Sequence, residues 1–191
     1  MHDKVRVAAF AFWAAAGMAQ ATDIAGLAAT CHSCHGIDGA SVGPSMPSIG
    51  GQNENYLKQV MLEQKHDKRY SSIMGRLLRT YSDEEIALMA QYFAAKPWVP
   101  AAVESEMRMV NRGRQLAQKT CQRCHGATGE RIVEGTPRLA GQWPGYLAIE
   151  STKYTDPTFN RNKPSERMAE RVCNLAAEDI QAVVHFLGTR K

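Results

Sequence analysis

The chain has 191 residues, of which 44% are hydrophobic, and a formal net charge of +4. This length suits one ordinary domain or two very small ones. The mild positive charge argues neither for nucleic acid nor for a strongly acidic partner, so the motifs must indicate the function.

Residues 1–21 have the pattern of a secretory signal peptide. Lys4 and Arg6 form a short positive region, an apolar stretch follows, and AQA at 19–21 is a small-x-small cleavage signal. The alternative is an uncleaved membrane anchor, but a span needs about 20 apolar residues and this stretch is shorter. No later segment is apolar enough to cross a membrane. We therefore predict a soluble, exported, periplasmic protein whose mature chain begins near Thr22.

An internal repeat runs through the rest of the chain. The stretch CHSCHG at 31–36 recurs as CQRCHG at 121–126, an offset of 90 residues. At the same offset, PSIGGQ at 47–52 recurs as PRLAGQ at 137–142. The chain therefore contains two homologous copies of one unit.

The repeat sets the expected domain boundaries. Pro97 and Pro100 make the joint between the copies extended and fairly stiff. The expected units, in chain order, are a signal peptide over 1–21, a first domain over 22–96, a linker over 97–106 and a second domain over 107–191.

Apolar periodicity predicts helices in both copies and no convincing strand, so the expected fold class is all-α. Ser82 and Glu85 form a capping box at the start of one helix, and Ala176 replaces this serine in the second copy. The expected helices lie over about 23–31, 55–66, 82–96, 106–124, 144–153 and 178–188.

The two CxxCH motifs predict a covalent cofactor in each copy. Each half has about 80 residues and few large apolar side chains, so its core would be thin on its own. In an exported chain, CxxCH is typical of c-type haem, in which two cysteines bind the porphyrin edge and the histidine binds the iron. We therefore predict two haems c, attached through Cys31, Cys34, Cys121 and Cys124, with His35 and His125 as axial ligands.

Two other chemistries also use paired cysteines. A zinc site would require both halves to share one ion and would leave the two histidines unexplained. A thioredoxin-like redox site occurs in a βαβ context, which this sequence does not predict. Both fit the pattern less well than haem.

A sixth iron ligand is expected from Met74 in the first copy and Met168 in the second. They occupy equivalent places before the last helix, at an offset of 94 caused by an insertion in the second copy. Methionine–histidine ligation raises the potential, whereas an open position would bind gases or peroxide. The main alternative is a second histidine, His66 or His185. With both positions closed, we expect no catalytic residue on this chain.

Several residues near the methionines have more than one possible use. Cys173 has no counterpart in the first copy, and we expect a small buried hydrophobe near the haem rather than a reactive thiol. The neighbouring cations could be solvated, steer an acidic redox partner or pair with haem propionates. These cations are Lys65, Lys68, Arg69, Arg76, Arg79, Arg161, Lys163, Arg167 and Arg171.

The order of CxxCH, PxxxGQ, methionine and final helix resembles the dihaem, two-domain class I cytochromes c over essentially the whole mature chain. The resemblance implies that His35 and Met74 bind one iron and His125 and Met168 the other. It also implies two domains facing each other about a pseudo-twofold axis, each a few helices around a covalent haem.

Three stretches outside the haem motifs resemble the cytochrome subunit of flavocytochrome c sulfide dehydrogenase. They are SVGPSMPSI at 41–49, SSIMGR at 71–76 and LAGQWPGYL at 139–147. The resemblance implies a heterodimer with an FAD-containing subunit that oxidises sulfide, with FAD on that partner and not on this chain. Because a reduced flavin holds two electrons and each iron accepts one, two haems could drain it.

The expected function is electron transfer from that partner to a downstream acceptor, without catalysis by this chain alone. The alternatives are a free dihaem shuttle that feeds a terminal oxidase and a dihaem peroxidase. The peroxidase requires one iron without a strong sixth ligand, which Met74 and Met168 argue against.

Overall fold

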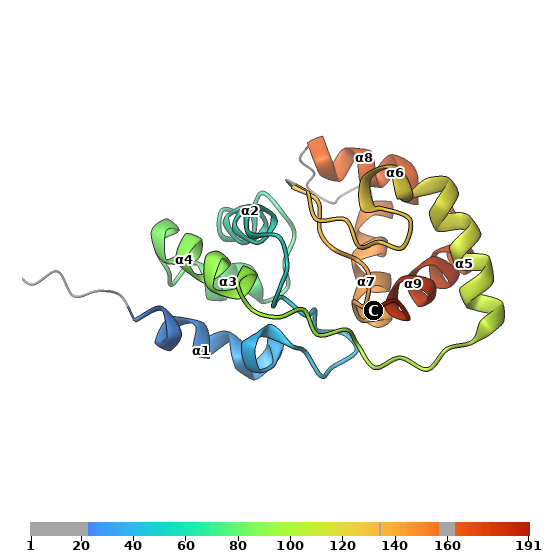
Figure 1. Ribbon diagram of the computed structural model, residues 1–191. Coiled ribbons are helices and arrows are strands. Elements are labelled where there is room, and N and C mark those ends of the chain that lie inside the picture. Colours follow the sequence, from blue (N-terminus) through green and yellow to red (C-terminus); the bar gives the residue numbers. More distant parts are fainter. Residues whose placement is uncertain (1–22, 134, 157–162) are drawn as a thin grey trace, which may run out of the picture.

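The regular structure is almost entirely helical. This computed structural model describes residues 23–133, 135–156 and 163–191 (Figure 1). Within these ranges no strand occurs, and the only β-type pairing is an isolated bridge between Val133 and Thr136. None of the helices in the described ranges is long and apolar enough to span a bilayer. The predicted signal peptide, 1–21, lies outside the described residues.

The first half of the chain forms one group of helices. In order they are α1 (Ile24–His35), the 3-10 helix η1 (Ile37–Gly39), α2 (Glu54–Lys65), α3 (Met74–Leu78) and α4 (Asp83–Ala94). Helix α4 packs against both α1 and α2 and supplies four of the seven buried hydrophobic side chains that the structure describes in this half of the chain. The capping box is confirmed, because the Ser82 side chain accepts from the Glu85 amide and the Glu85 carboxylate accepts from the Ser82 amide.

The second half forms a similar group. In order its helices are α5 (Met107–Thr120), α6 (Gln122–His125), α7 (Pro144–Thr155), α8 (Lys163–Val172) and α9 (Ala177–Gly188). The helix expected over 106–124 is interrupted at Cys121, where φ is −109° but the backbone stays in the right-handed helical region. Helices α3 and α8 were not expected, and each carries one of the two candidate methionines.

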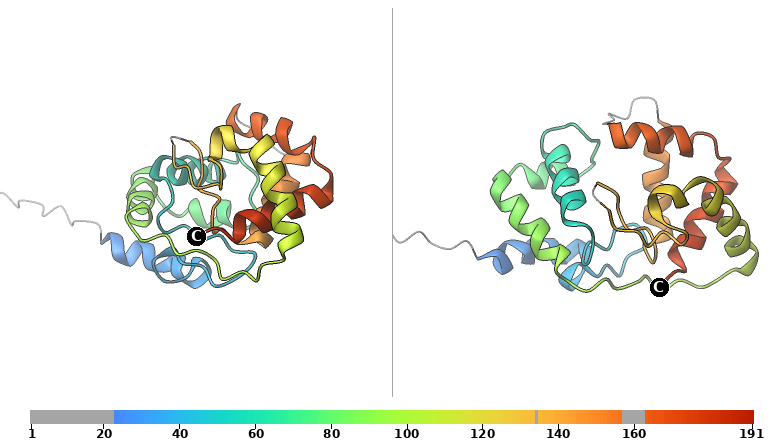
Figure 2. Two further views of the ribbon diagram at one scale, coloured as in Figure 1. Left: turned by 45° about the vertical axis from the view of Figure 1, so that its right-hand side comes forward. Right: turned by 45° about the horizontal axis from the view of Figure 1, so that its top comes forward.

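The two groups lie side by side, with their loops between them. Both views of Figure 2 show the loop that precedes α2 and the loop between α6 and α7 in the space between the groups. The segment between α4 and α5 contains no helix and runs along one edge of the molecule (Figure 1). The loops that follow the two CxxCH motifs therefore face each other.

Helices α5 and α9 cross at the closest helix contact in the second half, and a glycine sets how close they come. A Cβ added at Gly113 would lie 2.0 Å from the Ala182 carbonyl oxygen and 2.7 Å from the Phe186 Cβ. This approach lets Val110 and Phe186 pack in the core of the second half, where they are 2% and 1% exposed.

Gly113→Ala should destabilise the protein although alanine is the better helix former. The added methyl group cannot fit against the α9 backbone without separating the helices, which should cost about 2 kcal/mol or more. Denaturant unfolding followed by circular dichroism measures the change. The matched control is Gly43→Ala, where a Cβ meets nothing within 4 Å, so stability should change by less than about 1 kcal/mol. Equal stabilities of the two variants would contradict this account of the helix crossing.

Candidate functional site

The histidines of the two CxxCH motifs have equivalent surroundings. His35 ends α1 and His125 ends α6, and they are only 7% and 5% exposed. Their Nδ1 atoms lie 2.9 Å from the Pro47 carbonyl oxygen and 3.2 Å from the Pro137 carbonyl oxygen. A carbonyl can only accept, so Nδ1 carries the proton and Nε2 keeps its lone pair.

Burial keeps both imidazoles in the form that binds metals. It lowers the pKa of His35 and of His125, against the smaller raising effect of the proline carbonyls. A neutral ring oriented through its Nδ1–H is the usual arrangement of a metal-ligating histidine. The residues therefore fit the iron-ligand role predicted for them.

A left-handed glycine follows each histidine and turns the chain toward the proline. Gly36 has φ 77° and Gly126 has φ 84°. A Cβ at Gly36 would lie 1.9 Å from the Ala40 carbonyl oxygen, so no other residue fits this turn. The turn brings the proline carbonyl back under the histidine ring.

The cysteines of each motif lie at the edge of a core. Cys31 and Cys121 are partly buried and pack against core residues, whereas Cys34 and Cys124 are exposed. Burial raises the pKa of the Cys31 thiol and raises that of Cys121 to about 11. All four are unpaired, so a helix end in each half presents two free thiols and a histidine.

The zinc alternative receives no support from the positions of the side chains. In the described parts of the chain, no three His, Cys, Asp or Glu side chains gather as a metal site would require. The two CxxC pairs do not come together to share one ion.

The candidate sixth ligands are both half-buried. Met74 is the first residue of α3 and packs against the cluster of Leu78, Ile86 and Met89, which Cys31 also contacts. Met168 lies in α8, followed by the buried Ala169.

The rival histidines are engaged elsewhere. The Nε2 atom of His185 accepts a hydrogen bond from the Glu106 amide at 3.1 Å. His66 is exposed at the end of α2, with its Nε2 3.6 Å from an Asp83 carboxylate oxygen. Met74 and Met168 therefore remain the predicted sixth ligands.

The expectation that Cys173 is buried is wrong. It is exposed after the end of α8, and its thiol donates to the Tyr154 carbonyl at 3.5 Å. The core-facing residues of this helix end are Ala169 and Val172, which are 3% and 8% exposed. Cys173 lies next to that face and is left at the surface.

A family model described as cytochrome c matches the chain twice, over residues 21–95 and 110–191. The chain belongs to the cytochrome c family. Two matches identify a dihaem class I cytochrome c, and membership implies covalent haem c and electron transfer. The two histidines with free Nε2 atoms and the neighbouring thiols fit this cofactor.

Full-length likeness is to cytochrome c4. The cytochrome c4 of Pseudomonas aeruginosa is 32% identical over 181 residues, which cover 91% of this chain and 87% of the relative. The crystal structure of cytochrome c4 from Pseudomonas stutzeri covers 88% of this chain and 97% of its own, with 24% identity and a TM-score of 0.78. This likeness of fold confirms the predicted all-α arrangement of two cytochrome c domains.

A partial likeness is to the cytochrome subunit of sulfide dehydrogenase from Chlorobaculum tepidum. That protein is 40% identical over 67 residues, which cover 35% of this chain and 60% of the relative. The specific resemblance predicted from the sequence is therefore found over one part of the chain, within a broader likeness to cytochrome c4.

Two glutamines join the domains and were missed as functional residues in the sequence. Gln142 accepts from the Ser48 amide and donates to the Ser48 carbonyl, both at 2.9 Å. Gln52 accepts from the Arg138 amide at 2.7 Å and donates to the Arg138 carbonyl at 3.1 Å. Both glutamines end a PxxxGQ repeat, so the repeat was the available signal, but it did not reveal their partners.

A buried polar cluster adds a second contact between the domains. Arg69 of the first domain is 7% exposed and donates to Glu150 and Tyr154 of the second, at 3.3 and 3.2 Å. Burial would lower the pKa of Arg69, but Tyr154, Tyr56 and Glu150 raise it overall. Burial also raises the pKa of Tyr56 in the first domain and of Tyr146 in the second. Arg69 is thus a structural cation rather than a free one.

Arg69→Leu should destabilise the two-domain structure by about 3 kcal/mol, because it leaves a buried carboxylate without one of its partners. Lys153 still pairs with Glu150 and limits the loss. Denaturant unfolding of the haem-loaded protein measures the effect. Arg76→Leu is the control, since Arg76 is exposed on α3, and its effect should stay within about 0.5 kcal/mol. Similar losses in both variants would show that the contact does not join the domains.

Proposed function

We propose that this dihaem cytochrome c accepts electrons from an FAD-containing, sulfide-oxidising subunit and passes them to a downstream acceptor. The observation that carries the proposal is the 40% identity with a sulfide dehydrogenase cytochrome subunit over 67 residues, which cover 35% of this chain. The FAD would belong to the partner, which would form a heterodimer with this chain. The chain itself would conduct electrons and catalyse nothing alone.

The haem of the first domain would be attached through Cys31 and Cys34, with His35 and Met74 as axial ligands. The haem of the second would be attached through Cys121 and Cys124, with His125 and Met168 as axial ligands. Each haem iron stores one electron when bound. The residues of the chain orient the histidines, close the sixth position against other ligands and exclude water.

The protein would act in the periplasm, after removal of residues 1–21. The mature chain would then comprise a first domain over 22–96, a linker over 97–106 and a second domain over 107–191. The helix groups α1–α4 and α5–α9 are consistent with this division.

The loop after His35 offers a surface for the partner. Val42 and Ile37 are 89% and 78% exposed, more than the other large hydrophobic side chains of the described residues. The two side chains lie five residues apart in one loop, so a partner that covers this loop would remove both from water. Their position in the loop after the first CxxCH would place the partner beside the first haem.

A free electron shuttle is the second candidate. It is favoured by the full-length likeness to cytochrome c4, which covers 91% of this chain. In this case the chain would carry electrons to a terminal oxidase without a permanent flavin-bearing partner.

Methionine ligation predicts that Met74→Leu opens the sixth position of one haem only. The charge-transfer absorption of methionine-bound ferric haem should fall by about half, and reduced protein should bind carbon monoxide at that haem. Met89→Leu is the matched control, because Met89 lies in the same cluster as Met74 and is 1% exposed. An unchanged spectrum of Met74→Leu would exclude Met74 as a ligand.

The partner proposal predicts that protein purified from its native source carries flavin and haem in a ratio of one to two. Val42→Glu should release the flavin subunit, because the new charge would be buried at the interface. Met107→Glu is the control: Met107 is 62% exposed at the start of α5 and its change should leave the complex intact. Flavin and haem absorbance after gel filtration reports both results. A wild-type cytochrome isolated without flavin would contradict the heterodimer and favour the free shuttle.

A further inference from the structure

The peptide group between Pro47 and Ser48 makes two hydrogen bonds that point in opposite directions. Its carbonyl oxygen accepts from Nδ1 of His35 at 2.9 Å, within the first domain. Its N–H, which belongs to Ser48, donates to Oε1 of Gln142 at 2.9 Å, in the second domain. One amide therefore connects the histidine of one domain to the glutamine of the other.

The equivalent peptide group of the second domain connects the histidine of the second domain to the glutamine of the first. The Pro137 carbonyl accepts from Nδ1 of His125 at 3.2 Å. The N–H of Arg138, in the same amide, donates to Oε1 of Gln52 at 2.7 Å. The two chains of hydrogen bonds cross the domain boundary in opposite directions, as a twofold relation between the copies requires.

Both glutamines are buried, and burial strengthens a series of linked hydrogen bonds. Gln52 and Gln142 are 5% and 2% exposed, and Ser48 is 2% exposed. Each glutamine also donates to the carbonyl of the residue that it accepts from, and its Oε1 accepts a further bond from the backbone N–H of the next residue, so its side chain is held by three bonds. Water has little access to compete for the N–H groups, and in a low dielectric hydrogen bonds in a chain polarise one another.

We propose that Gln142 and Gln52 are positioning residues that tune the iron-binding histidine of the opposite domain. An acceptor on the Ser48 N–H increases the negative charge on the Pro47 oxygen through amide resonance. A stronger acceptor draws the Nδ1 proton of His35 and makes Nε2 a better donor to iron, which favours the oxidised metal. The potential of each haem thus depends on a side chain from the other domain. The proposal rests on the proposed ligation by His35 and His125.

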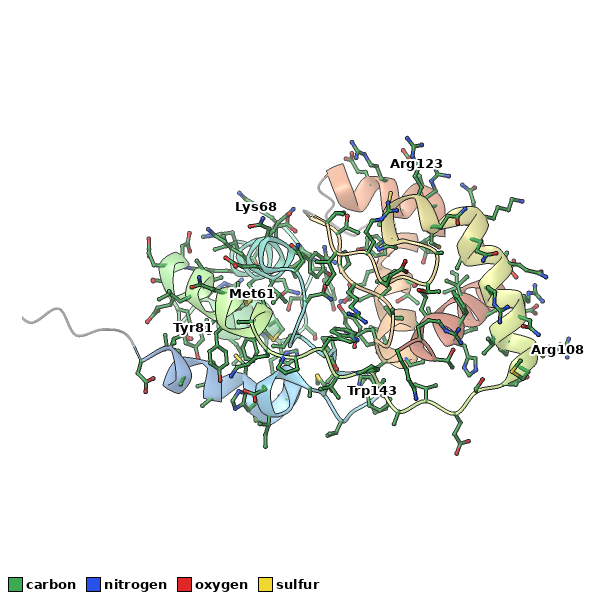
Figure 3. All side chains as sticks on the ribbon, in the orientation of Figure 1. Met61, Lys68, Tyr81, Arg108, Arg123 and Trp143 are labelled. Carbon is green, nitrogen blue, oxygen red and sulfur yellow. The ribbon has the colours of Figure 1, made fainter. Side chains whose placement is uncertain are left out.

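Purely structural glutamines would behave differently. If they only held the domains together, their loss would affect both haems equally or neither. The Trp143 side chain provides the comparison, because its Nε1 donates to the Ser41 carbonyl of the first domain at 3.0 Å. The backbone N–H of Trp143 donates to Oε1 of Gln142, and a change of the side chain keeps that bond. Figure 3 shows Trp143 near the edge where the two halves meet. Trp143→Phe removes a contact between the domains and leaves both chains of hydrogen bonds intact.

The test is a redox titration of the haem-loaded protein followed by NMR, in which haem methyl signals report each domain separately. In Gln142→Met the first-domain haem should become about threefold more reduced at a fixed ambient potential, or about 28 mV higher at 59 mV per tenfold change. The second-domain haem should change much less. Gln52→Met should give the mirror result, and Trp143→Phe should move neither.

A conservative variant and a second NMR measurement distinguish an effect on the haem potential from a general disruption of the structure. Gln142→Glu keeps an acceptor oxygen, so the first-domain potential should stay at or below the wild-type value. In reduced protein, the Nδ1–H resonance of His35 should shift in Gln142→Met and that of His125 should not. The proposal would be overturned if the haem potential shifted only in the domain that contains the substituted glutamine, or if both haem potentials shifted equally. A wild-type spectrum without iron-bound histidine signals would instead overturn the ligation on which it rests.

Discussion

The hydrogen bond from a histidine Nδ1 to a proline carbonyl twelve residues later occurs once in each half of this protein. It fixes the tautomer and the direction of the ring, and with burial it leaves a neutral Nε2 available to iron. A left-handed glycine directly follows each histidine and turns the chain out of the helix there. The same peptide groups also bond to the other domain, so the contact between the domains depends on this short return of the chain.

The contact between the domains combines symmetric and asymmetric interactions. Residues that match in the repeat make matching bonds, as Gln52 and Gln142 do with the backbone of the other domain. Arg69 and Trp143 make contacts without a counterpart, since Arg69 reaches Glu150 and Trp143 reaches Ser41. The symmetric bonds involve the peptide groups that accept from the histidines, whereas Arg69 forms a buried ion pair with Glu150. The two halves are therefore held as one unit mainly through the loops that support the histidines.

The sequence was sufficient for the features that local physics determines. Helical periodicity, the Ser82–Glu85 capping box and the position of CxxCH at a helix end were all predictable, because each depends on residues a few positions apart. The short helices α3 and α8 were not predictable, since helices of 5 and 10 residues form through tertiary packing rather than propensity. The partners of Gln52 and Gln142 are backbone groups of another domain, and no side-chain pattern encodes them. Cys173 was misplaced because the expectation rested on the usual burial of cysteine, whereas its position is set by helix α8, which ends just before it and was not foreseen.

The central claim is that each CxxCH motif binds one haem covalently, next to a histidine oriented by its hydrogen bond to a proline carbonyl. The most direct measurement is the intact mass of the denatured chain from the periplasm after extraction with acidified organic solvent. The account predicts a chain that begins near Thr22 and retains the mass of two haems. A chain that loses its haem to the solvent, or retains only one, would contradict it.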